Sequence, residues 1–171
     1  MKLFRSILLL SSRQLAVRLF GPVALSLLLY AIGYTLAAFI VVQLFIEGFA
    51  LWQLAIGLTL FRSELGVSRG WFIFNMVFAM LYRLTTNGYQ IYHHVQYGAF
   101  FPMETVWWIV PEHLYASLGV VYCFYVNARL IRYSEEKIGM QDFSVKQIFF
   151  RLLLFPWGMW YVQPRLNRMA T

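Results

Sequence analysis

The stretch from Phe20 to Phe61 reads FGPVALSLLLYAIGYTLAAFIVVQLFIEGFALWQLAIGLTLF, and its 42 residues contain one charged side chain, Glu47, and no Lys or Arg. A helix needs about 20 residues to cross a hydrocarbon core of roughly 30 Å. The stretch is therefore long enough for two membrane spans joined by a tight turn.

The sequence leaves the position of this turn open. Glu47-Gly48 is the best chemical signal, but only 13 residues then remain before Arg62. A helix of that length rises about 20 Å, which is short of the hydrocarbon core. Either the turn lies earlier, or the second helix continues past Arg62 and that side chain snorkels toward the headgroups.

The whole chain has the composition of a membrane protein. Of its 171 residues, 61% are hydrophobic and 12% are charged, whereas soluble domains are about half apolar and a quarter charged. The net charge of +7 does not indicate a nucleic-acid surface, because the Lys and Arg residues stand at the ends of apolar segments. There they mark the cytoplasmic side and attract anionic lipids. We expect an integral membrane protein that binds no nucleic acid.

The positions of the basic residues predict the topology. Residues 71–82, WFIFNMVFAMLY, begin a third span, and a fourth follows an aromatic-rich stretch that lacks Lys and Arg. With four spans and a cytoplasmic N-terminus, thirteen of the fourteen basic residues are cytoplasmic or interfacial, and Arg83 is the exception. An alternative topology, with residues 22–46 as one span and the tail as a fourth, puts six basic residues outside and is disfavoured by the positive-inside rule.

We therefore expect an all-α integral membrane protein, a four-transmembrane-helix bundle with amphipathic interfacial helices at both ends. No repeat or linker divides residues 1–171, so we treat them as one membrane domain. Both termini are expected in the cytoplasm, and a bacterial inner membrane fits best. The expected segments are an interfacial helix at 1–20, a two-span hairpin at 21–61, a third span at 70–88, an outer loop at 89–104, a fourth span at 105–128 and a cytoplasmic interfacial or re-entrant segment at 144–163.

Arg83 is the most costly residue of this arrangement. A guanidinium inside a span costs a few kcal/mol unless it is paired or hydrated. Glu112, early in the fourth span, is the expected partner within the chain. The functional interpretation is an intramembrane ion pair or proton-relay site, and the structural one is snorkelling or pairing with another subunit.

The three histidines lie in the outer region that lacks basic residues. His93 and His94 follow the third span, and His113 is in the fourth. Neutral imidazole binds haem iron, copper and zinc, so these residues are candidate haem or metal ligands. Their spacing matches no specific motif, and neighbours on a helix point about 100 degrees apart, so at most one of the adjacent pair faces the fourth span. Hydrogen-bonded packing at the interface is the alternative, and no other cofactor is indicated.

The C-terminal segment predicts a surface element. Basic residues flank its apolar part at both ends, and lying in the interface is easier for such a segment than crossing. The residues expected to dock a partner or the membrane surface are Arg151, Trp157, Trp160, Arg165 and Arg168. Most other aromatic residues near the span ends fit an aromatic belt at headgroup level.

Signatures of catalysis are missing from the sequence, which contains no phosphate-binding Gly loop, GxSxG or HExxH motif. An enzyme is therefore not expected. The sequence favours a non-catalytic accessory or scaffold subunit of a multi-subunit membrane complex for transport, secretion or polysaccharide synthesis, with other membrane subunits as partners. Two alternatives remain, namely a haem- or quinone-contacting anchor of a redox complex and a small transporter or proton channel that uses Arg83 and Glu112.

Overall fold

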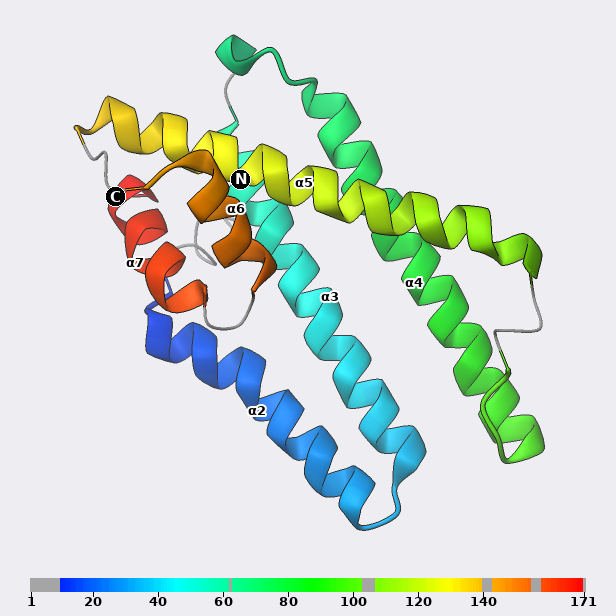
Figure 1. Cartoon of the computed structure of the whole chain (residues 1–171). Coiled ribbons are helices and arrows are strands. Elements are labelled where there is room, and N and C mark those ends of the chain that lie inside the picture. The colour runs from blue at the N-terminus through cyan, green and yellow to red at the C-terminus, as the bar shows by residue number, and fades with distance from the viewer. Residues whose placement is uncertain (1–9, 62, 103–106, 140–142, 155–157, 171) are drawn as a thin grey trace.

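The computed structural model describes residues 10–61, 63–102, 107–139, 143–154 and 158–170. These residues form six α-helices and two short 3-10 helices (Figure 1), which confirms the all-α fold. The elements are α2 (Ser12–Ala31), α3 (Thr35–Leu60), η1 (Ser63–Leu65), α4 (Arg69–Tyr97), η3 (Trp107–Ile109), α5 (Val110–Lys137), α6 (Val145–Leu153) and α7 (Met159–Ala170).

Three of the described helices, α2, α3 and α5, are long and apolar enough to cross a membrane. Helix α4 has 29 residues and is the longest, but its second half includes Arg83, Asn87 and the two adjacent histidines. These polar side chains explain why α4 is not among the candidate spans, although its length of about 43 Å exceeds the hydrocarbon core.

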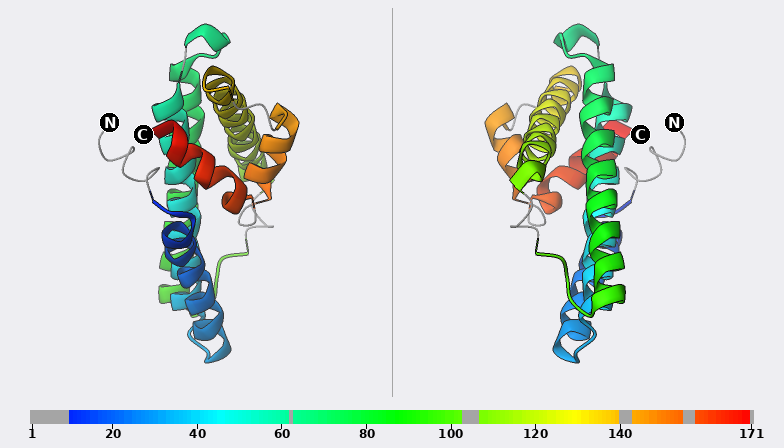
Figure 2. Two further views of the ribbon diagram at one scale, coloured as in Figure 1. Left: turned by 90° about the vertical axis from the view of Figure 1, so that its left-hand side faces the viewer. Right: turned by 90° about the vertical axis from the view of Figure 1, so that its right-hand side faces the viewer.

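The long helices form a layer that is covered on one side. Helix α2 packs on α3, and α3 packs on α4. Seen edge-on, these three helices lie in one layer, and α5 and α6 lie on one side of it (Figure 2). Helix α5 contacts α3, α4 and α6, while α7 contacts α6 and the beginning of α2.

The turn between the first two long helices lies at Ile32-Gly33-Tyr34 and not at Glu47-Gly48. Gly33 has a φ of +89°, a left-handed conformation that glycine adopts without a steric penalty. The amide of Tyr34 donates to the carbonyl oxygen of Leu29 at 2.8 Å and closes the turn. The earlier turn leaves 26 residues for α3, enough to cross the membrane completely.

The first long helix begins earlier than expected. Ser11 and Gln14 form a capping box, in which the Ser11 hydroxyl accepts from the Gln14 amide and the Gln14 side chain accepts from the Ser11 amide. The helix then continues through Pro22. The described part of the expected interfacial helix at 1–20 is thus the first part of α2, and residues 1–9 lie outside the described residues.

Two further boundaries differ from the expected ones. Helix α4 continues past residue 88 to Tyr97, so the expected outer loop at 89–104 begins only at Gly98, whose φ of +72° ends the helix. Helix α5 runs from Val110 to Lys137 rather than from 105 to 128. Residues 103–106 lie outside the described residues.

The core lies where the C-terminal half of α3 meets α4, α5 and the tail helices. Trp52 and Phe72 are among its largest buried side chains. The described part of the expected segment at 144–163 contains α6 and the beginning of α7, which contribute Ile148, Leu152 and Val162 to this core. Their apolar faces are therefore buried against the bundle, which an element lying only on the lipid surface would not require.

Candidate functional site

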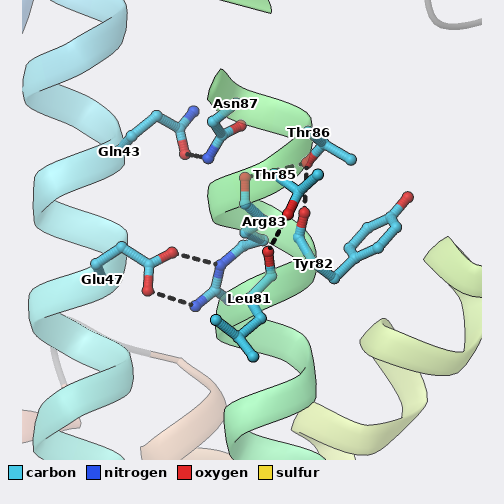
Figure 3. A network of polar contacts seen from close by, with 8 residues as sticks. All are labelled: Gln43, Glu47, Leu81, Tyr82, Arg83, Thr85, Thr86 and Asn87. Carbon is cyan, nitrogen blue, oxygen red and sulfur yellow. Dashed lines mark hydrogen bonds and ion pairs between the residues drawn. The ribbon is translucent and has the colours of Figure 1, made fainter. Parts of the chain in front are cut away.

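The most polar place along the long helices is a two-step ladder between α3 and α4. The Arg83 guanidinium donates from Nε to Glu47 Oε1 at 3.0 Å and from Nη2 to Glu47 Oε2 at 3.3 Å. One turn away, Asn87 Nδ2 donates to Gln43 Oε1 at 2.7 Å (Figure 3). We call these four residues the polar ladder.

The spacing of the polar ladder follows from helix geometry. Gln43 and Glu47 are four residues apart on α3, and Arg83 and Asn87 are four apart on α4. Side chains at i and i+4 lie on the same face of a helix. Because the two helices run in opposite directions, the first residue of one pair meets the second residue of the other. Two N–H groups of the guanidinium face the two carboxylate oxygens, so the Arg83–Glu47 step is bidentate.

The structure gives Arg83 a different partner from the one expected. Its carboxylate partner is Glu47 of α3. The Arg83 side chain is 25% exposed and the Glu47 side chain is 13% exposed. Glu112 is exposed in the first turn of α5, where a carboxylate interacts favourably with the helix dipole. The predicted Arg83–Glu112 pair is therefore replaced by a pair that joins neighbouring antiparallel helices.

Three cavities meet at Arg83. One of about 360 Å³ lies toward the C-terminal part of α4, and the polar residues Thr86, Asn87 and Gln90 line it together with aromatic rings. A second, of about 270 Å³, lies between α4 and α5 and includes Ser117. A third, of about 230 Å³, has almost entirely apolar walls and includes Met76. The guanidinium thus stands between polar and apolar space.

The three histidines do not come together as a ligand set. His93 Nδ1 lies 2.7 Å from the carbonyl oxygen of Ala99. His94 packs on the ring of Phe100 and lines a cavity of about 510 Å³ between the α2–α3 hairpin and the end of α4, which adjoins the 360 Å³ cavity at Phe39 and Phe100. His113 Nδ1 lies 3.4 Å from the Tyr82 hydroxyl. Among the described residues no three His, Cys, Asp or Glu side chains are placed to hold a metal.

The basic residues of the tail are largely engaged by the chain itself. Arg165 donates to Glu135 at 2.6 Å, and the Glu135 side chain is fully buried. The Arg151 guanidinium stacks over Phe143 at 3.3 Å. Of the other residues expected to dock partners, Trp160 is 45% exposed, Arg168 is exposed and Trp157 lies outside the described residues.

Sequence reasoning missed several buried polar contacts that hold the bundle together. Trp52 Nε1 donates to Gln163 Oε1 at 2.9 Å and joins α3 to α7. Asn127 Nδ2 donates to the backbone and side-chain oxygens of Gln53, each at 2.8 Å, and joins α5 to α3. A lone amide inside an otherwise apolar stretch was the available signal, because a buried amide needs a partner.

Comparison of this chain with protein-family models, curated proteins and solved structures found no match. The fold and the polar ladder define a helical protein with membrane-span-length helices and a partly buried ion pair. Its function must be inferred from this geometry.

Proposed function

We propose that this chain is a non-catalytic accessory subunit that serves as a helical scaffold in a larger membrane complex. The observation that carries the proposal is the low burial of α2 and of the first part of α3. In the most apolar 18 residues of each helix, 12% are buried in α2 and 17% in α3, against 50% in α5, and the buried residues of α3 lie mainly in its C-terminal part. Helices of a self-sufficient bundle pack against one another over more of their surface.

The one-sided layer supports the same role. Helices α5 and α6 cover one side of the α2–α3–α4 layer, and no other long helix of the described chain lies on the opposite side (Figure 2). Large apolar side chains along the hairpin, such as Leu27 at 67% and Leu44 at 66%, are exposed. A partner subunit can pack on this apolar surface without the cost of covering polar groups.

The buried polar pairs favour a rigid body over a moving one. They join α3 to α4, to α5 and to α7. Separating any of these helices leaves a buried polar group without its partner, which costs about 1–3 kcal/mol for a neutral group and more for a charge. Fixed helix positions suit a part that holds other subunits in place.

The proposed membrane arrangement has four crossings, with α4 as the third. Helices α2 to α4 run alternately down, up and down in Figure 1, and α5 then returns the chain to the side where α4 began. We place both termini and nearly all Lys and Arg residues on the cytoplasmic side, where exposed ones such as Lys146 contact anionic lipids. A bacterial inner membrane suits this arrangement.

The test is photo-crosslinking in the native membrane. Benzoylphenylalanine replaces Leu27 or Leu44 on the hairpin, and the matched control carries it at Leu118, which is 59% exposed on α5. We expect one or more larger membrane proteins to be captured from the hairpin positions and recovered in the same complex in mild detergent. Native mass then gives the composition of that complex.

Two outcomes would contradict the proposal. Adducts to lipid alone from both hairpin positions, with a native mass equal to one chain, would show that the hairpin faces only lipid. Equal capture of the same protein from position 118 would show that crosslinking depends only on the exposure of the position and not on a particular docking surface.

A further inference from the structure

We propose that the cavities around Arg83 form a binding groove for an uncharged amphipathic molecule, an isoprenoid quinone, whose head lies between Tyr82 and His113. This binding role goes beyond the scaffold function and does not depend on it. The two cavities between α4 and α5 share the residues Tyr82, Arg83 and His113. They are therefore neighbouring parts of one groove.

Hydroxyl and amide side chains line one end of the groove, and apolar side chains line the end nearer the start of α4. The cavity of about 360 Å³ includes Thr86 and Asn87, whereas the cavity of about 230 Å³, nearer the start of α4, includes Met76 and Phe124. A volume of 360 Å³ lies within the range of about 300–1,000 Å³ that small-molecule sites occupy. A ligand with a polar head and an apolar tail matches this gradient.

The charge of the walls selects an uncharged head. Arg83 is the one Lys or Arg among the described lining residues, and Glu47 already neutralises it. An ionised head would need a second cation, since an unpaired charge at this depth is costly. A head with carbonyl oxygens needs only hydrogen-bond donors.

Suitable donors stand at the centre of the groove. The Tyr82 hydroxyl lies 3.4 Å from His113 Nδ1, which is long for a hydrogen bond from a hydroxyl. Such a loosely held hydroxyl can turn to donate to a ligand carbonyl, and the imidazole can supply a second donor. The rings of Phe39 and Phe100, whose centroids are 4.9 Å apart, complete the wall of the polar cavity. Aromatic walls pack well on a flat ring.

The experiment uses the full chain in phosphatidylcholine nanodiscs with an azidoquinone that carries a ten-carbon tail. After illumination, mass spectrometry identifies the labelled peptides, and decylubiquinone serves as the competitor. We expect labelling in α4 and α5 around Tyr82 and His113 that excess decylubiquinone displaces. Loss of both donors in Tyr82→Phe/His113→Ala is expected to weaken competition about tenfold, as for two lost hydrogen bonds.

Two more variants test whether labelling depends on the groove itself. Ser117→Phe changes an exposed residue that lines the groove and is expected to block labelling by occupying the space. Tyr125→Phe is the matched control, because Tyr125 is 48% exposed on α5 and lines none of these cavities, and it should leave labelling unchanged.

The proposal is overturned if labelling is not displaced by decylubiquinone, if it occurs mainly in the cavity beside His94, or if neither groove variant reduces it. Displacement by decyl phosphate at the same concentration as decylubiquinone would also overturn it, because the groove would then accept an anionic head.

Discussion

Removal of one member of the Arg83–Glu47 pair is expected to destabilise the protein far more than removal of both. In Arg83→Leu, the Glu47 carboxylate loses two hydrogen bonds and its counter-charge in a setting where it is 13% exposed. Glu47→Leu leaves the guanidinium unpaired in the same way. Replacing both residues leaves two leucines beside the apolar side chains of Ile46 and Met80, which line the adjoining cavity.

The magnitude follows from the burial of each partner. Breaking a buried ion pair from one side costs about 3–5 kcal/mol. The lower end, about 3 kcal/mol, applies here because the Arg83 and Glu47 side chains are 25% and 13% exposed and so are not fully desolvated. The double variant is expected within about 1 kcal/mol of the original protein, since an apolar replacement of a buried pair is often neutral.

The assay is reversible unfolding of the purified chain in detergent micelles, read as loss of helix signal, for the two single variants and the double variant. Glu112→Leu is the matched control and should change the unfolding free energy by less than about 0.5 kcal/mol, because the residue is exposed. The reasoning is refuted if the double variant loses as much stability as the two single losses added together, since the cycle would then show no coupling.

Three other substitutions test the packing. Gly57→Ala is expected to cost about 1–3 kcal/mol because a Cβ would lie 2.1 Å from Phe72 Cζ; the added Phe72→Leu change should recover part of that loss in the same unfolding assay. Gly158→Ala would put a Cβ 1.5 Å from a backbone oxygen of α6, so we expect faster cleavage of the tail in limited proteolysis. Arg165→Met is expected to cost about 3–5 kcal/mol because Glu135 is fully buried, and a Glu135→Met/Arg165→Met variant that unfolds as easily as the single one would contradict the pairing.

The kind of fold was predictable because charge-free length is a strong signal. A stretch of 42 residues with one charged side chain has few structural options besides paired helices across a membrane. Helix ends were less predictable, although capping signals were present. Ser11 with Gln14 and Ser144 with Gln147 have the three-residue spacing of a capping box, and each begins a helix here.

The tail shows a limit of reasoning from charge. Basic residues at both ends of a segment indicate an interfacial position only if their charges face water or headgroups. Arg165 instead pairs with Glu135, and Arg151 stacks on an aromatic ring. Arg165 and Glu135 are 30 residues apart, so no local pattern predicts their contact. The same is true of the bond between Trp52 and Gln163. Phe143 lies nearer to Arg151 but outside the segment at 144–163.

The partner of Arg83 could not be identified while the position of the turn was open. A turn at Glu47-Gly48 would put Glu47 at the membrane surface and remove it as a partner for a charge inside a span. With the turn at Gly33, Glu47 lies inside α3, and a buried carboxylate then needs a cation as much as Arg83 needs an anion. Gln43 lies four residues before Glu47, and Asn87 lies four residues after Arg83. Only an antiparallel pair of long helices lets both steps of the polar ladder form together. That Arg83 needs a partner was therefore predictable from this residue alone, whereas the identity of the partner depended on the register of α3 and α4.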